Sequence, residues 1–185
     1  MSRDFLPEAT LREMAADAWR LWRDGRFRPA SVGQGADRAL RPEVRGDRIL
    51  WVDPGTASPA LGAYLAAMEG LRRGLNAELF LGLETVEAQL AVFPAGAFYR
   101  KHLDRFAQSG ERAISAVLYL NAAWRPQDGG ALRLHLDEGP VEVLPEMGTL
   151  AVFRSDTVWH EVLEAAAPRL SATGWFRRRP TLPVP

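Results

Sequence analysis

Short apolar segments, each bounded by turn-forming residues, follow one another after Leu83 and constrain the fold more than any other feature of the sequence. Each segment has the length and the residue types of a β-strand. No helical pattern separates the segments, which argues against the crossover helices of a doubly wound parallel sheet. Their spacing favours an antiparallel sandwich or a jelly roll. The predicted strands are 87–93, 113–120, 131–136, 141–144, 149–153, 161–164 and 169–177.

Two amphipathic helices are predicted ahead of this β region. In the first, over 7–24, apolar residues recur at helical spacing, and Gly25 follows as a C-terminal stop. In the second, over 60–80, Ser58 is placed to cap the first turn and Pro59 to begin it. We therefore expect both helices to pack on the β region through one apolar face each.

These patterns predict an α+β fold with a double-stranded β-helix (jelly-roll) core supported by N-terminal helices. A chain of 185 residues suits one domain. We expect a single domain over 1–185, in which 1–83 form the helical support with a loop and 84–179 form the jelly-roll core. The loop, 27–59, holds one strand-like run at 49–52, and long loops of this kind are often functional.

The composition excludes several kinds of site. The chain has no cysteine, so it can form no disulfide and no thiolate site, and any metal must be held by His, Asp or Glu. A net charge of +0 gives no electrostatic reason to expect nucleic acid or a membrane as partner. No signal peptide or membrane-spanning stretch is evident, so we expect a cytoplasmic protein. Lys101 is the only lysine, which leaves anion binding to arginine.

Only three histidines are available as metal ligands: His102, His135 and His160. His102 and Asp104 are two residues apart, so an extended segment would send both side chains to one face. His160 would come from a different strand. Two histidines and one carboxylate leave the other positions of an ion open for a co-substrate and O2, as in non-haem iron(II) oxygenases. A solvated surface pair is the alternative for His102 and Asp104.

A predicted strand downstream carries an arginine that suits an acidic co-substrate. Arg169, Ser171, Thr173 and Trp175 alternate along 169–177 and therefore share one face. A buried guanidinium could bind the far carboxylate of a dicarboxylic acid through two parallel hydrogen bonds. The alternative for Arg169 is a solvated residue at the end of the strand.

Several motifs between 88 and 178 carry a resemblance to a known family. They are Phe93-Pro94-Ala95-Gly96, Tyr99-Arg100-Lys101-His102-Leu103-Asp104-Arg105, Tyr119-Leu120-Asn121, Trp124, Gly129-Gly130-Ala131-Leu132-Arg133-Leu134, His160-Glu161-Val162 and Arg169-Leu170-Ser171 followed by Trp175. In this order they resemble the prolyl 4-hydroxylase branch of the 2-oxoglutarate oxygenases, particularly the oxygen-sensing prolyl hydroxylases and their bacterial relatives. Upstream, 44–51 resembles the segment that precedes the core in these enzymes.

The resemblance assigns roles in binding the metal and the co-substrate. It implies that His102, Asp104 and His160 bind Fe(II). It also implies that Arg169 binds the distal carboxylate of 2-oxoglutarate and that Tyr119 supports that carboxylate. Ser171, on the same face as Arg169, is a further candidate contact. No catalytic residue beyond the metal site is expected.

The substrate pocket is also implied by the resemblance. Tyr99 matches a family residue near the metal and the substrate, and Trp175 matches one that lines the pocket beyond Arg169. Arg100, next to Tyr99, is a third candidate. Phe93 departs from the family, because the animal oxygen sensors carry a tyrosine there. The hydroxyl contact that such a tyrosine would make with the co-substrate is therefore absent.

The implied reaction consumes 2-oxoglutarate and O2, releases succinate and CO2, and hydroxylates a prolyl residue in a protein or peptide. Ascorbate is expected to support the reaction. One alternative is the same chemistry on a free amino acid or small metabolite, and a second is a non-catalytic binding module of cupin type, because a fold does not fix a function. We expect the loop between Arg28 and Trp51 to fold over the mouth of the site and to contribute to substrate recognition.

The remaining residues that could carry chemistry are better explained by structure. His135 alternates with leucines on a predicted strand and is interpreted as a structural or surface histidine. The pair 129–130 is predicted to form a turn, because no Gly-Lys-Ser/Thr of a phosphate loop follows. Ser109 and Ser155 lack the partners of a serine hydrolase. The arginines at 177–179 are expected to be solvated.

Overall fold

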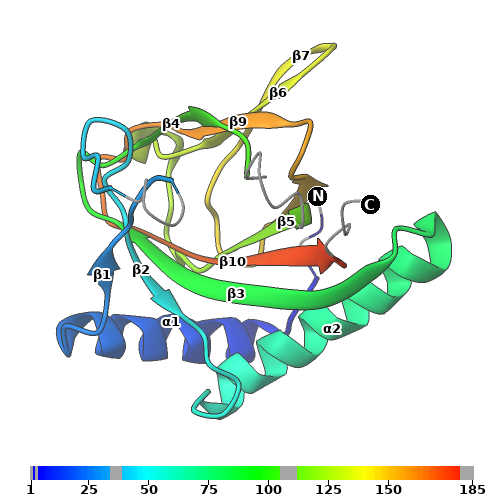
Figure 1. Cartoon of the computed structure of the whole chain (residues 1–185). Helices are drawn as coiled ribbons and strands as arrows, with labels where there is room; N and C mark the ends of the chain where they lie inside the picture. Colours follow the sequence, from blue (N-terminus) through cyan, green and yellow to red (C-terminus); the bar gives the residue numbers. More distant parts are fainter. Residues whose placement is uncertain (1, 3, 34–38, 105–111, 180–185) are drawn as a thin grey trace.

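Two antiparallel β-sheets that face each other, with two helices outside the larger sheet, make up the computed structural model of the chain (Figure 1). The structure describes residues 2, 4–33, 39–104 and 112–179. The larger sheet runs in the order β1 (Arg28–Pro29), β2 (Arg48–Trp51), β3 (Leu83–Phe93), β10 (Arg169–Arg178), β5 (Arg112–Tyr119) and β8 (Leu150–Arg154). The smaller sheet runs β4 (Tyr99–His102), β9 (Trp159–Val162), β6 (Leu132–Leu136) and β7 (Gly139–Val143).

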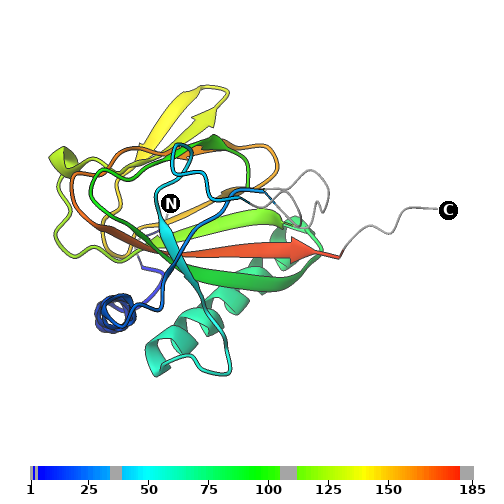
Figure 2. The ribbon, with the colours of Figure 1, turned by 60° about the vertical axis from the view of Figure 1, so that its left-hand side comes forward.

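Both helices lie on the face of the larger sheet that points away from the smaller one (Figures 1 and 2). α1 (Glu8–Arg23) ends just before Gly25, which adopts a positive φ of 67°. α2 (Pro59–Leu79) begins as predicted, because the Ser58 side chain accepts a hydrogen bond from the Leu61 backbone N–H at 3.3 Å. None of the helices in the described ranges is long and apolar enough to cross a membrane.

The central strands of the larger sheet are buried on both faces, and alternation of side chains along these strands separates two cores. On β10, Leu170, Ala172 and Phe176 join the core between sheet and helices. The residues between them face the smaller sheet, where a second core includes Phe93 and Tyr119. Because side chains alternate along a strand, one strand can pack helices with one set of residues and line a cavity with the other.

The predicted α+β jelly roll is confirmed, while each predicted strand differs from the observed one at one boundary or at both, most of all β3 and β9. β3 begins at Leu83 rather than at 87, and β9 spans Trp159–Val162 rather than 161–164. β9 starts earlier because Trp159 and His160 pair with His135 and Leu134 of β6. That pairing joins strands far apart in the sequence, so the local pattern did not indicate it.

The expected loop contributes more regular structure than its sequence indicates. β1 and β2 both come from it, and β2 pairs with β3 along the whole of Arg48–Trp51. A division of the chain at 83 and 84 therefore separates strands that belong to one sheet. This shared sheet supports the single domain over 1–185 that we propose.

Candidate functional site

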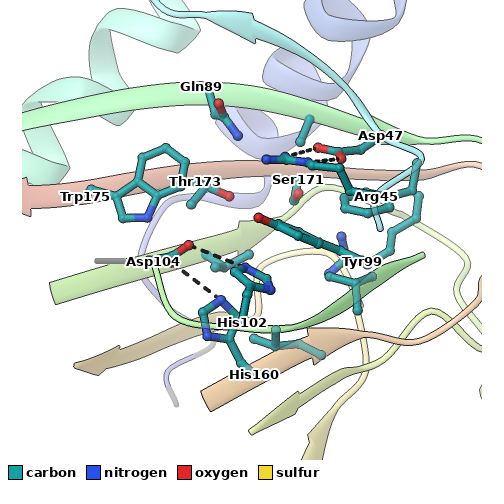
Figure 3. A pocket seen from close by; sticks show the side chains of 16 residues that line it. Arg45, Asp47, Gln89, Tyr99, His102, Asp104, His160, Ser171, Thr173 and Trp175 are labelled. Carbon is teal, nitrogen blue, oxygen red and sulfur yellow. Dashed lines mark hydrogen bonds and ion pairs between the residues drawn. The ribbon is translucent and has the colours of Figure 1, made fainter. Parts of the chain in front are cut away.

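A pocket opens between the two sheets, and it brings together side chains from both (Figure 3). The larger sheet contributes Arg169, Ser171, Thr173 and Trp175 from β10 and Gln89 from β3. The smaller sheet and the segments next to it contribute Tyr99, His102, Asp104 and His160. The cavity therefore contains most of the residues that the sequence predicted for a functional site.

Two histidines and one aspartate converge at one place in this pocket. The potential ligand atoms of His102, Asp104 and His160 all lie within 4.8 Å of one another. The Asp104 oxygens lie 3.6 Å from Nε2 of His102 and 3.5 Å from Nε2 of His160. His102 and His160 are paired across the adjacent strands β4 and β9, which explains how residues so distant in sequence meet.

Both histidines are oriented through the ring nitrogen that faces away from the aspartate. Nδ1 of His102 lies 2.7 Å from the carbonyl oxygen of Arg100, and Nδ1 of His160 lies 3.0 Å from that of Val158. A carbonyl oxygen can only accept, so Nδ1 carries the proton in each ring and Nε2 keeps its lone pair. A hydrogen bond from the second ring nitrogen to a backbone carbonyl fixes the tautomer and the ring orientation of metal-binding histidines.

The charges in the cluster suit a cation. Burial alone raises the pKa of the Asp104 carboxyl, but His160 and His102 outweigh burial and hold that pKa well below its ordinary value. Burial lowers the pKa of His102. For His160, burial also acts to lower the pKa, yet Asp104 outweighs it and raises that pKa. An ionised carboxylate with two imidazoles, and with other positions left open, is the donor set that suits Fe(II).

Arg169 forms the polar end of the pocket on the side of β10. Its side chain is 1% exposed, and burial lowers its pKa. Nε donates a hydrogen bond of 2.8 Å to the carbonyl oxygen of Gly130. No carboxylate within the described ranges forms an ion pair with this guanidinium. Asp47 acts on this charge without forming an ion pair with it, and a buried charge that lacks a directly paired counter-charge is costly, so the site fits an anionic ligand.

Tyr119 and Ser171 lie beside this arginine. The guanidinium carbon of Arg169 is 4.9 Å from the centre of the Tyr119 ring. The Tyr119 hydroxyl is buried and makes no hydrogen bond of good geometry in the described parts of the chain, although Arg169 is near enough to act on its pKa. Ser171 is 1% exposed and lines the pocket. A carboxylate at Arg169 would give these groups a partner, so the residues present fit the distal end of 2-oxoglutarate.

Gly130 makes room for Arg169, a role that the sequence did not indicate. It adopts a φ of +64°, and an added Cβ would lie 2.9 Å from Cβ of Ala165 and 3.3 Å from Cδ of Arg169. In place of the turn expected at 129–130, Gly129 forms an isolated bridge with Ala165, and Gly130 N–H donates to the carbonyl of Glu164. Glycine is thus required both for the backbone conformation and for the approach of the arginine.

Arg45 and Asp47 form a second polar group in the pocket wall. Arg45 donates two hydrogen bonds to the Asp47 carboxylate, from Nε at 2.7 Å and from Nη2 at 2.6 Å. Its guanidinium carbon also lies 4.2 Å from the centre of the Tyr99 ring. The sequence analysis gave these residues no role, although two charges of opposite sign at a spacing of two indicate a pair on one face.

Two residues of the loop that was expected to fold over the mouth of the site lie in the pocket wall. Arg45 and Asp47 come from the stretch between Arg28 and Trp51, and both line the pocket. Residues 34–38 of that stretch lie outside the described residues. The contribution of the loop to substrate recognition therefore stays a prediction.

The opposite end of the pocket is aromatic. Trp175 is 6% exposed, and its indole N–H is buried without a hydrogen-bond partner in the described ranges. Arg112 lies over the Trp175 ring at 3.8 Å, and the half-exposed Trp51 lies 5.9 Å from it. Gln89, across from Thr173 on the neighbouring strand, is 5% exposed and lines the cavity (Figure 3). This end offers apolar surface with a few polar groups, as ligand pockets do.

Arg100, a further candidate for the substrate pocket, is not among the residues that line this cavity. Its side chain is exposed and donates from Nε to the carbonyl oxygen of Glu43 at 2.7 Å. The cause is an irregular register in β4 between Tyr99 and His102. Tyr99 and His102 both face the cavity and their rings stack at 3.5 Å, so the backbone between them departs from simple alternation.

Of the residues to which the sequence analysis gave no functional role, some lie away from this site, and Ser155 forms a hydrogen bond next to it. His135 lies on the outer face of the smaller sheet, 3.2 Å from a Glu161 oxygen. Ser155 is fully buried and bonded to Ser115. Arg179 is largely exposed and pairs with Glu84. Ser109 lies outside the described residues.

Comparison with known proteins gives the same picture. Residues 88–177 match the family model of the 2OG-Fe(II) oxygenase superfamily. A prolyl-4-hydroxylase from Pseudomonas putida shares 49% identity with a TM-score of 0.86, over 96% of this chain and 91% of that one. A prolyl hydroxylase from Trichoplax adhaerens, solved with a hypoxia inducible factor oxygen degradation domain peptide fragment, shares 27% identity with a TM-score of 0.86, over 95% and 81%.

A more distant structure shows the shared fold alone. The viral collagen prolyl hydroxylase of Paramecium Bursaria Chlorella virus-1, solved as a 2OG complex, is 18% identical with a TM-score of 0.67. The alignment covers 96% of this chain and 94% of that one. The jelly roll is therefore retained across relatives whose sequences have diverged widely.

Proposed function

Because the chain belongs to the prolyl 4-hydroxylase family of the 2-oxoglutarate- and Fe(II)-dependent oxygenases, we propose that it hydroxylates a prolyl residue in a protein or peptide. It is a 2-oxoglutarate-dependent dioxygenase, and His102, Asp104 and His160 fit the iron site of this family. The observation that carries the prolyl substrate is the 49% identity to a prolyl-4-hydroxylase across nearly the whole of both chains.

The cofactors define the reaction. Fe(II), 2-oxoglutarate and O2, when bound, supply an oxidant that inserts one oxygen atom into a C–H bond, while the other oxygen atom enters succinate and CO2 is released. The residues of the chain hold the reactants in place and keep water away from the reacting atoms. Leu132, Val162 and Phe93 in the pocket wall give that site apolar surroundings.

Arg169, Tyr119 and Ser171 are proposed to bind 2-oxoglutarate. The Arg169 guanidinium would meet the distal carboxylate with the donors that Gly130 does not occupy. The Tyr119 hydroxyl would donate to the same group, and the Ser171 hydroxyl lies on the same face of β10. Arg169 and the iron site lie on opposite sheets, so the co-substrate would span the cavity between them.

Tyr99 and Trp175 are proposed to hold the substrate. Both line the cavity, and Tyr99 stacks on the ring of His102. A pyrrolidine ring is small and apolar, and aromatic side chains offer it flat surface beside the metal. Gln89 and the indole N–H of Trp175 could bond to the peptide groups on either side of the proline, which a free metabolite would lack.

The test is the identification of the hydroxylated product. The purified enzyme, loaded with Fe(II), is incubated with 2-oxoglutarate and cell lysate, and peptides are mapped by mass spectrometry for prolines heavier by one oxygen atom. The proposal predicts such a proline in a protein, and none with the His160→Ala variant. Oxygen gained only by a free amino acid or small metabolite would assign the same chemistry to the alternative substrate class.

A further inference from the structure

We infer that Ser115 and Ser155 form a relay of two hydroxyl groups that holds Asp104 in position for metal binding. Oγ of Ser115 lies 2.6 Å from Oδ2 of Asp104, and Oγ of Ser155 lies 2.8 Å from Oγ of Ser115. Both serines are 0% exposed. The inference concerns the metal site and holds for any substrate of the enzyme.

Asp104 needs such support more than the two histidines do. His102 and His160 belong to paired strands, and backbone carbonyls orient their rings. Asp104 lies beyond the end of β4, outside any strand. A carboxylate without backbone pairing can rotate, and the bond from Ser115 holds one of its oxygens from the side opposite the two histidines.

The direction of both hydrogen bonds follows from the charge of the aspartate. An aspartate that binds a metal ion does so as the ionised carboxylate, which can only accept a hydrogen bond. Ser115 must therefore donate its single hydroxyl proton to Asp104. Ser155 must then donate to Ser115, because the Ser115 proton is already used. Two donors in sequence polarise each other and strengthen the bond to the carboxylate.

The relay also joins the two sheets. Ser115 lies on β5 and Ser155 directly follows β8, both in the larger sheet, where Ser155 N–H donates to the carbonyl of Ala113 at 3.0 Å. Asp104 follows β4 of the smaller sheet. One ligand of the site is thereby tied to the sheet opposite the two histidines, which makes these serines positioning residues.

The test measures metal affinity directly, without turnover. Mn(II) is titrated into each variant, and free Mn(II) is followed by electron paramagnetic resonance. Ser115→Ala should weaken Mn(II) binding by roughly 10- to 100-fold, the usual effect of losing a residue that orients a ligand. Ser155→Ala should weaken it less, by about 3- to 10-fold, because Ser115 still donates to Asp104.

Thr149→Val is the matched control. Thr149 is 5% exposed, its hydroxyl is buried without a partner in the described ranges, and it does not line the pocket. Removing this hydroxyl should leave Mn(II) affinity unchanged. Affinity in Ser115→Ala within twofold of the unaltered enzyme would overturn the inference.

A second readout separates positioning from general damage. Co(II) bound to the site has a visible spectrum that depends on ligand geometry, and we expect it to change in Ser115→Ala and not in Thr149→Val. If Ser115→Ala fails to fold, Ser155→Ala decides alone. Weaker binding with a changed spectrum supports the relay, and unchanged binding excludes it.

Discussion

At the scale of single residues, His160 has the clearest consequence. It supplies one of the three side chains of the iron site, and its replacement leaves only His102 and Asp104 to bind the metal. We predict that His160→Ala abolishes succinate formation from 2-oxoglutarate and removes tight Mn(II) binding. His135→Ala is the control, since His135 pairs with Glu161 outside the pocket and should leave both measurements unchanged. Full activity in His160→Ala would place the metal elsewhere.

Arg169 tests the proposed co-substrate contact. Arg169→Lys keeps a cation but loses the planar fork that bonds a carboxylate at two points. Loss of a charge-assisted hydrogen bond costs about 1.5–3 kcal/mol, so we expect the KM for 2-oxoglutarate to rise roughly 10- to 100-fold. The measurement is succinate formation over a range of 2-oxoglutarate concentrations.

The control for this substitution is a surface arginine. Arg133 pairs with Glu142 on the outer face of the smaller sheet, so Arg133→Lys should leave the KM for 2-oxoglutarate unchanged. An unchanged KM in Arg169→Lys would remove Arg169 from the co-substrate site, whatever the substrate of the enzyme.

Part of the site could be predicted from the sequence, because the chain has few residues of the types that bind a metal. With no cysteine and three histidines, few metal sites were possible, and the structure brings the expected three ligands together. Arg100 was a candidate only as the neighbour of Tyr99, and the irregular register in β4 turns Tyr99 and His102 toward the cavity while the side chain of Arg100 is exposed. The relay through Ser115 and Ser155 joins strands distant in sequence, and two ordinary serines give no local signal.

At the scale of elements, the segment that leads into β6 leaves room for the side chain of Arg169. Gly130 has a positive φ and lies against Arg169, whereas Gly82 has a similar φ of +65° with open space where a Cβ would be. Gly130→Ala should therefore combine backbone strain with overpacking, at a cost of about 1–3 kcal/mol from the overlap alone. It should also raise the KM for 2-oxoglutarate.

Gly82→Ala separates the two causes. It shares the strained backbone and lacks the overlap, so thermal unfolding should show a smaller loss of stability and the KM should not change. Equal losses of stability in both variants would show that the approach of Arg169 contributes nothing beyond the backbone conformation.

The elements themselves were predicted where their patterns are local. Both helices carry clear periodicity and a recognisable start or stop, and their observed bounds differ little from the predicted ones. β1 has two residues, Arg28–Pro29, and exists only through its pairing with β2. A strand that owes its existence to a partner cannot be found from its own residues.

At the scale of the whole molecule, the ligands should stabilise the fold because they connect the two sheets. The histidines lie on the smaller sheet and Arg169 on the larger one. Ligand at 100 times its Kd adds about 2.7 kcal/mol to stability, which corresponds to a rise in Tm of roughly 5–10 °C for a chain of this size. Thermal unfolding with Mn(II) and 2-oxoglutarate measures this rise.

Removal of the metal should reverse the effect. Addition of a chelator is expected to return the Tm to that of the ligand-free enzyme, and His160→Ala should show little response to Mn(II). An equal rise of Tm in His160→Ala would mean that the ions stabilise the protein at another place.

Strand β10 also sets fixed distances along one wall of the pocket. Its inward residues, from Arg169 to Trp175, recur at intervals of about 7 Å along a stiff, doubly paired strand. The anchor for the diacid is thereby set at a constant distance from the aromatic end. A diacid one carbon shorter or longer, held by the same arginine of the larger sheet, would bring its reacting end to the wrong position relative to the histidines of the smaller sheet, and a misplacement of roughly 1 Å can cost about 100-fold in rate. The fixed separation between the two sheets should therefore select the co-substrate by its length.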